Sequence, residues 1–328
     1  MSPYLLIAVS LICPMAGVER GEATFRPTDA EAKIPQHFRL AAATFPYELE
    51  QVRETPNYTV SRVRFPSPIV TVDIANNTVH AEYFQPKTAG KRPAVVVLHI
   101  LGADFALSRY YAARLADRGV AALFVKLPYY GERRGADGEK RFLSADIDRS
   151  VASMGQGVCD VRRAAAWLAG RPEVDAGRLG VTGISLGGIV SSIAASVDPT
   201  LNRAALLLAG GGLGEVLWEM PEAAKYRLLW VASGRTKADL IALTSPLDPL
   251  TYAEGLRGKR VIMMAGRVDE VIPAKAAEAL WEKAGRPTIR WFECGHYSAA
   301  GYLLPAIRDA VEFFAVEPNE KKVREMRG

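Results

Sequence analysis

The stretch Arg178-Leu-Gly-Val-Thr-Gly-Ile-Ser-Leu-Gly-Gly-Ile-Val190 decides how the rest of the chain is organised. Its apolar start is typical of a buried strand, and its end is compatible with a helix. Between them, Ser185 stands at the apex of a sharp turn, the context of a nucleophile elbow. A serine there adopts a strained conformation with its neighbours close by, which favours glycine at 183 and 187. For this motif alone, an ordinary glycine-rich turn with a capping serine is the alternative.

Composition indicates a globular protein with a substantial core. The chain has 328 residues, of which 49% are hydrophobic and 23% charged, enough for one large α/β domain or two ordinary ones. The net charge is +5, but the Lys and Arg residues are scattered and no basic tract is interleaved with aromatic residues. We therefore expect no nucleic-acid partner.

Cysteine usage predicts neither a metal site nor a disulfide framework. Cys13, Cys159 and Cys294 show no metal-ligand spacing, so we expect no metal and no cofactor. Cys159 and Cys294 permit one disulfide, but the favoured interpretation is two separate thiols.

The N-terminus predicts export. The apolar run from Leu5 to Cys13 is too short to span a bilayer but long enough for the core of a signal peptide, and small residues follow at Ala16 and Gly17. Residues 1–17 are therefore assigned to a signal peptide, with a periplasmic or secreted mature protein and no stable membrane span. No positive charge precedes the run, so a buried N-terminal segment of a cytoplasmic protein is the alternative.

The chain from 18 onward divides into an extension and a large domain. Residues 18–57 are punctuated by proline and are expected to wrap the surface, with short helices over Ala30 to Leu40. Two alternating stretches, Tyr58 to Phe65 and Thr78 to Phe84, predict half-buried antiparallel strands at the start of a domain spanning 58–328.

Continuous apolar runs then predict strands buried on both faces of a sheet. They are Ala94–His99, Val120–Val125, Leu179–Thr182, Ala204–Ala209 and Val261–Ala265, with a last strand at Thr288–Phe292. Helical stretches lie between them: Tyr110–Arg118, Gly155–Leu168, Gly188–Ser196 and Ala274–Ala284, with Pro305–Phe314 closing the chain. This alternation predicts an α/β fold with a mostly parallel sheet and helices on both faces.

One connection is far longer than a crossover needs. Residues 210–259 separate two predicted strands, and apolar residues recur in them at helical spacing. We interpret 212–258 as an inserted helical cap. Trp218, Tyr226 and Trp230 either line an acyl pocket there or only anchor the cap.

Three predicted strand ends carry the groups for nucleophilic catalysis. Ser185 follows one strand, Asp269 follows the Val261 strand, and His296 follows the Thr288 strand. Ligands bind outside the carboxyl ends of strands in such sheets. A serine hydroxyl needs an imidazole to remove its proton and a carboxylate to hold that imidazole. The order Ser, Asp, His is the one expected for an α/β-hydrolase.

The other candidates for these roles fit less well. Of four histidines, His296 alone follows the acid, on a glycine-flanked loop. Glu270 is interpreted as a helix-start or surface charge, and Asp248 as a turn cap in Ser-Pro-Leu-Asp-Pro-Leu.

An oxyanion formed on acyl attack needs two backbone N–H donors. Leu186, directly after the serine, is expected to supply one. The loop His99-Ile-Leu-Gly102 is expected to supply the other, with Leu101 favoured.

Together these features resemble the α/β-hydrolase family from about residue 60 to the end. The layout is most similar to the dienelactone-hydrolase-like and acetyl-xylan-esterase-like branches. Pro128-Tyr-Tyr-Gly-Glu-Arg133 is also similar to a turn in one sparsely characterised subgroup. One departure is Ile100, a β-branched residue where the family usually has glycine. The resemblance implies ester hydrolysis through an acyl-enzyme, with a small-molecule ester as partner.

Two alternatives remain at this point. One is a serine peptidase or amidase of the same fold, although the chain is too short for the β-propeller that such enzymes often carry. The other is a non-catalytic binding protein on a hydrolase scaffold, which would be expected to have lost part of the triad. The sequence leaves the oligomeric state open.

Overall fold

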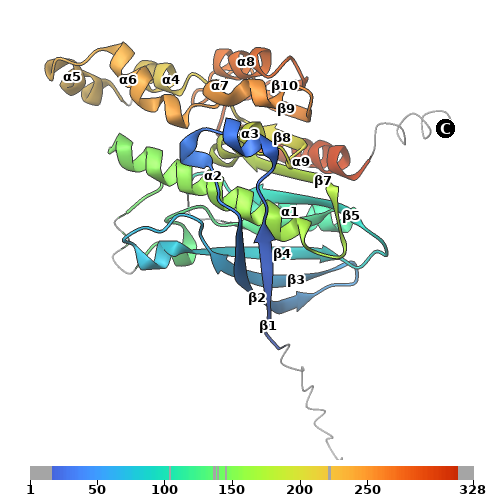
Figure 1. The fold of residues 1–328 in the computed structure, drawn as a ribbon. Coiled ribbons are helices and arrows are strands. Elements are labelled where there is room, and N and C mark those ends of the chain that lie inside the picture. The colour runs from blue at the N-terminus through green and yellow to red at the C-terminus, as the bar shows by residue number, and fades with distance from the viewer. Residues whose placement is uncertain are drawn as a thin grey trace, which may run out of the picture.

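A ten-stranded mixed sheet forms the centre of the molecule (Figure 1). In this computed structural model the described residues are 17–316, except 103–104, 136–137, 139, 145 and 221–222. The strand order is β1-β2-β3-β4-β6-β5-β7-β8-β9-β10. The predicted signal peptide, apart from Gly17, lies outside the described residues.

The first four strands pair antiparallel and form one end of the sheet. They are β1 (Glu19–Phe25), β2 (Ala43–Glu54), β3 (Tyr58–Pro66) and β4 (Thr78–Pro86). Residues 18–57 thus supply two strands instead of only wrapping the surface. Between β1 and β2, two short 3-10 turns, Asp29–Lys33 and Gln36–Phe38, occupy the stretch where short helices were predicted.

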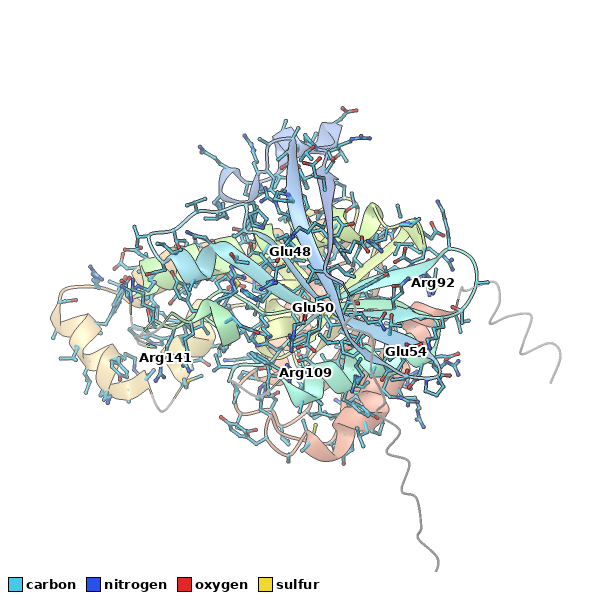
Figure 2. The ribbon with its side chains drawn as sticks, turned by 90° about the horizontal axis from the view of Figure 1, so that it is seen from below. Glu48, Glu50, Glu54, Arg92, Arg109 and Arg141 are labelled. Carbon is cyan, nitrogen blue, oxygen red and sulfur yellow. The ribbon has the colours of Figure 1, made fainter. Side chains whose placement is uncertain are left out.

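Half of the side chains of β2 are exposed and only one is buried, which is why its pattern did not predict a strand. Seen from below, Glu48, Glu50 and Glu54 follow one another along it (Figure 2). Each pairs with a cation on a neighbouring element, as in the contacts of Glu50 with Arg62 and Glu54 with Lys87. Exposed pairs of this kind add little stability, so the backbone ladder holds this part of the sheet.

The parallel part of the sheet contains the apolar runs of the sequence. Its strands are β5 (Arg92–Leu98), β6 (Ala121–Val125), β7 (Val174–Ile184), β8 (Arg203–Leu207), β9 (Arg260–Gly266) and β10 (Thr288–Phe292). Neighbouring strands from β6 to β10 all pair parallel, while β4 joins β6 antiparallel. Side chains on β5 alternate between two cores, with Val96 in one and Val95 and Val97 in the other.

Helices cover both faces, as the alternation predicted. They are α1 (Ala106–Asp117), α2 (Ile147–Ala169), α3 (Leu186–Val197), α8 (Ala274–Lys283) and α9 (Ala300–Ala315). Helix α2 begins well before the predicted Gly155, because Asp146 caps it by accepting the Arg149 N–H. Trp167 of α2 packs in one core, and Phe314 of α9 packs in the other.

The predicted insertion is helical. It contains α4 (Leu213–Glu219), α5 (Ala224–Ala232), α6 (Lys237–Thr244) and α7 (Pro249–Tyr252), with 3-10 turns at Ser245–Leu247 and Ala253–Leu256. Figure 1 shows α4, α5 and α6 running outward from the body, with α5 at the outer end. Within the described residues, no helix has the length and apolar character to cross a membrane.

Candidate active site

The turn between β7 and α3 holds Ser185 in a conformation that L-residues rarely adopt. Its φ is 54° and its ψ is −116°, and its N–H donates to the Leu207 carbonyl of β8 at 2.8 Å. A Cβ on Gly183 would lie 2.3 Å from the Gly187 carbonyl carbon, and a Cβ on Gly187 would lie 2.6 Å from the Leu98 oxygen. Both glycines are therefore required by close backbone approach, as the sequence predicted.

Ser185, His296 and Asp269 meet at the carboxyl ends of β7, β10 and β9. The Ser185 Oγ lies 2.8 Å from His296 Nε2, and His296 Nδ1 lies 2.9 Å from Asp269 Oδ2. Because a carboxylate oxygen can only accept, Nδ1 carries the proton and Nε2 is left to accept the serine hydroxyl. The arrangement is a continuous hydrogen-bonded chain from carboxylate to hydroxyl.

The backbone fixes the Asp269 carboxylate in place. Its Oδ1 accepts the N–H groups of Val271 and Ile272 at 2.9 and 2.7 Å, and its side chain is almost fully buried. Two backbone donors and the imidazole N–H therefore hold the carboxyl group in one orientation.

The rival carboxylates are engaged elsewhere. Glu270 Oε2 accepts the backbone N–H of His296 at 2.8 Å, so it orients the histidine loop, not the ring. Backbone hydrogen bonds, first from its own N–H and then from His296, lower the pKa of Glu270. A Cβ on Gly295 would lie 2.3 Å from this carboxylate, which accounts for the glycine before His296. Asp248 accepts the N–H groups of Gly212, Leu213 and Leu250, as a cap does.

The loop after β5 is oriented by the ring of His99. The Leu127 N–H donates to His99 Nε2 at 3.1 Å, so Nδ1 carries the proton and donates to the Ile100 carbonyl at 2.7 Å. Burial lowers the pKa of His99 to about 4, which keeps the ring neutral near pH 7. In a trans peptide the C=O and the next N–H point in opposite directions. The Leu101 N–H therefore points away from His99.

Tyr130 provides a second contact to the same loop. Its ring packs edge-on against His99, with centroids 4.4 Å apart. Burial raises the pKa of the Tyr130 phenol, and a hydrogen bond with the Gly102 backbone lowers it. Tyr130 thus packs on the ring that holds the Ile100 carbonyl.

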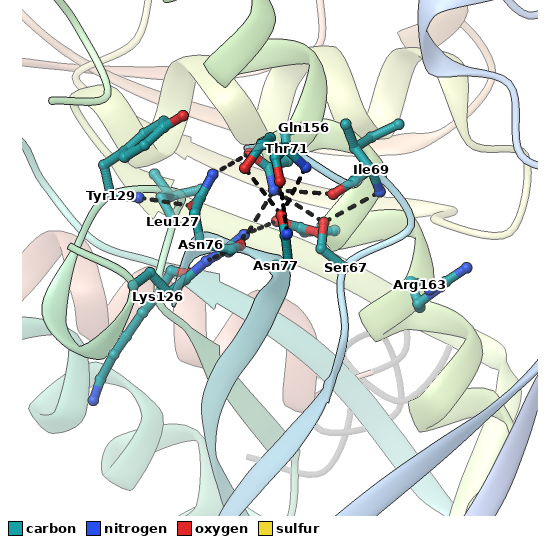
Figure 3. A network of polar contacts seen from close by, with 12 residues as sticks. Ser67, Ile69, Thr71, Asn76, Asn77, Lys126, Leu127, Tyr129, Gln156 and Arg163 are labelled. Carbon is teal, nitrogen blue, oxygen red and sulfur yellow. Dashed lines mark hydrogen bonds and ion pairs between the residues drawn. The ribbon is translucent and has the colours of Figure 1, made fainter. Parts of the chain in front are cut away.

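A buried polar network, which sequence reasoning missed, holds the turn at 126–133. Arg133 and Asp160 form an ion pair at 2.8 Å with side chains 0% and 1% exposed. Arg133 also donates to the carbonyls of Asn76 and Lys126. Figure 3 shows Asn76 at the centre of these contacts, where its Oδ1 accepts the Tyr129 N–H.

The same network ties the turn to α2. Gln156 donates to Ser67 Oγ at 3.1 Å and accepts from Asn76 Nδ2 at 2.7 Å (Figure 3). Ser67 in turn donates to Asp160 Oδ1 at 2.6 Å. Gln156 and Asp160 are four residues apart, so they share one buried face of α2. Their contacts with Asn76 and Arg133 connect this face to the turn at 126–133.

The three cap aromatics surround a common cavity of about 570 Å³. Its lining includes Trp218, Tyr226 and Trp230 together with Ser144 and Ile147 next to α2. Of the described residues that line it, none belongs to the Ser185, His296 and Asp269 group.

No metal site accompanies this geometry in the part of the chain that is described, where no cluster of three His, Cys, Asp or Glu residues is suitable for a metal ion. Cys159 and Cys294 are separate buried thiols.

Residues 25–209 match the protein family described as "Alpha/beta hydrolase domain containing 18". The match covers more than half of the chain and includes the turn of Ser185. The chain belongs to this family. As an alpha/beta hydrolase of this family, it also matches an uncharacterized protein from two strains of Mycobacterium tuberculosis. The identity is 26% over 219 residues, 62% of this chain and 50% of that protein. The chain thus spans about half the length of the curated relatives it matches.

Solved structures confirm the fold of this alpha/beta hydrolase. Acetyl xylan esterase 1 from Thermoanaerobacterium sp. JW/SL YS485 has a TM-score of 0.63 at 21% identity, covering 81% of this chain and 87% of that one. Acetyl xylan esterase from Paenibacillus sp. R4 has a TM-score of 0.66 at 19% identity, covering 86% and 90%. A putative dienelactone hydrolase from Klebsiella pneumoniae has a TM-score of 0.52 at 21% identity, covering 73% and 94%. These are the two branches that the sequence was found to resemble.

Proposed function

We propose that this alpha/beta hydrolase is a serine carboxylic-ester hydrolase that works through an acyl-enzyme. The observation that carries the proposal is the hydrogen-bonded chain Ser185–His296–Asp269 at three strand ends. The two acetyl xylan esterases share the fold, which supports an ester as the substrate. The substrate is then a small-molecule ester, and neither a metal nor a cofactor takes part.

Each residue has a distinct role in the proposed reaction. Ser185 Oγ attacks the ester carbonyl carbon while His296 Nε2 takes the hydroxyl proton. The tetrahedral intermediate collapses, the C–O bond to the alcohol breaks, and His296 returns the proton to the leaving alcohol. Water, deprotonated by His296, then attacks the acyl carbon. The bond from that carbon to Ser185 Oγ breaks, the carboxylic acid leaves, and His296 returns the proton to the serine oxygen. Asp269 keeps the imidazole in the required tautomer and stabilises its charged form.

Backbone donors at two positions are proposed to stabilise the oxyanion. Leu186 is the first residue of α3, so its N–H has no acceptor within the helix. Leu101 is exposed, and its N–H points away from His99 for the reason given above. Two such donors, fixed before the reaction, stabilise the developing charge without reorganisation.

The turn at 126–133 is proposed to position the second donor. Its Leu127 N–H sets the tautomer of His99, and its Tyr130 ring packs edge-on against the His99 ring. Arg133 acts through this turn and is therefore a positioning residue. The hydrogen bond from the His99 ring to the Ile100 carbonyl fixes the backbone at this position, so a β-branched residue is tolerated there.

The experiment that tests the proposal is hydrolysis of p-nitrophenyl esters of graded chain length beside matched anilides. We expect the esters to be turned over and the anilides to react far more slowly. Ser185→Ala and His296→Ala should each remove nearly all turnover at an unchanged melting temperature. Preferred cleavage of anilides would indicate an amidase, and no turnover of either class would indicate a binding protein.

A further inference from the structure

Helix α5 presents apolar side chains on two opposite faces. Tyr226, Leu229, Trp230 and Ser233 are spaced at i, i+3, i+4 and i+7, and all four line the cap cavity. This spacing accounts for one face of the helix only. The cavity therefore does not explain the apolar residues on the other face.

The second face points to solvent. Lys225, Leu228 and Val231 are three residues apart and so lie on one side of α5. Leu228 is 72% exposed and Val231 is 52% exposed, and no residue of α5 is buried. Figure 1 shows the helix at the outer end of the cap, away from the sheet.

Between Glu222 and Asp239 the chain carries only basic charged side chains. Residues 223–238 contain Lys225, Arg227, Arg235 and Lys237 and no Asp or Glu. In the described residues, the first three form no ion pair and instead stack on aromatic rings of the cap, at 4.6 to 5.9 Å from the ring centres. Carboxylates on the flanking helices are engaged: Glu219 pairs with Lys275 and Lys237, and Asp239 caps α6.

We propose that α5 docks on the surface of an anionic lipid bilayer. Exposed aliphatic residues flanked by Lys and Arg match the boundary between head groups and acyl chains. The cations complement anionic head groups. At nine residues α5 is too short to span, so it would lie in the interface. A second copy fits less well, because a twofold contact would bring the four cations of each copy together.

The test is co-sedimentation of the full chain with vesicles of phosphatidylcholine alone or of phosphatidylcholine with phosphatidylglycerol. We expect binding to the mixed vesicles only, weakening as salt is raised. Leu228→Ser/Val231→Ser and Lys225→Glu/Arg235→Glu should each weaken binding by about tenfold or more. Leu228 and Val231 line neither the cavity nor the Ser185 site, so turnover of a soluble ester by Leu228→Ser/Val231→Ser should stay the same.

The matched control is Leu304→Ser on α9, where Leu304 is 57% exposed. This variant should bind the mixed vesicles as the wild type does. Failure of the wild type to bind, or equal binding by all variants, would overturn the proposal. So would a dimer, measured by light scattering, that Leu228→Ser/Val231→Ser converts to a monomer. Vesicle binding is measured without turnover, so a failure of docking can be distinguished from a failure of the proposed catalysis.

Discussion

Replacing Arg133 with lysine tests whether the buried network around Arg133 positions the loop at 99–102, which is proposed to supply an oxyanion donor. Lysine keeps the charge beside Asp160 but loses the fork that reaches the carbonyls of Asn76 and Lys126. Leaving one or two buried acceptors unpaired costs about 1–3 kcal/mol each, so we expect the free energy of unfolding to fall by roughly 2–4 kcal/mol. The protein should remain folded at 25 °C if its stability is ordinary.

The catalytic effect should be larger than the loss of stability alone explains. Removing one oxyanion donor outright costs about 10²–10³ in kcat, so a displaced donor should cost about 10–100-fold, with little change in KM. The affinity for an alkyl boronic acid, which forms a tetrahedral adduct on the serine, should fall by a similar factor. Both are measured below the melting temperature of the variant.

Arg162→Lys is the matched control. Arg162 lies on α2, is equally buried, and pairs with Asp198 at 3.0 Å and with Glu31, away from the turn. It should lose comparable stability while keeping kcat and boronate affinity. Equal loss of kcat in both variants, or full activity in Arg133→Lys, would refute the positioning role.

Three further predictions concern other parts of the chain. First, because burial lowers the pKa of His99 to about 4 from 6.5, the unfolded chain takes up a proton first as the pH falls. His99 therefore contributes stability above about pH 6.5 that is lost towards pH 4, up to about 3 kcal/mol, and His99→Gln should flatten this part of the curve in urea melts. A curve parallel to that of the wild type would contradict it. Second, Trp218→Ala and Trp230→Ala should shift the acyl-length preference of turnover if the cap cavity accepts the acyl chain, at about 1 kcal/mol per methylene. An unchanged profile with a large drop in melting temperature would leave these aromatics as anchors. Third, the native protein should begin near Val18 when its N-terminus is sequenced, and retention of Met1 would exclude export by cleavage.

The sequence predicted the parts of the fold whose pattern is local. Continuous apolar runs indicate strands buried on both faces, and glycine at 183 and 187 reflects a backbone approach that any side chain would block. Strands β1 and β2 were missed because their stability comes from pairing, β1 with β2 and β2 with β3, while half of the side chains of β2 are exposed. A charged, proline-containing segment gives no period that distinguishes it from a surface loop.

The sequence predicted the three hydrogen-bonded groups of the candidate site, Ser185, His296 and Asp269, but not the buried residues that support them. Which charges are buried depends on partners far apart in the chain, as with Arg133, Asp160 and Asn76. One signal was available: Gln156 and Asp160 interrupt the otherwise apolar face of α2 at a spacing of four. Polar residues on a buried face imply partners.

Reaction with a fluorophosphonate, read by intact mass and peptide mapping, shows directly whether Ser185 is the nucleophile. We expect one adduct per chain, on Ser185, formed because His296 makes its hydroxyl nucleophilic. Asp269→Asn should slow labelling by several orders of magnitude by favouring the wrong tautomer of His296. A folded protein that forms no adduct, or forms one on another residue, would contradict this role of Ser185.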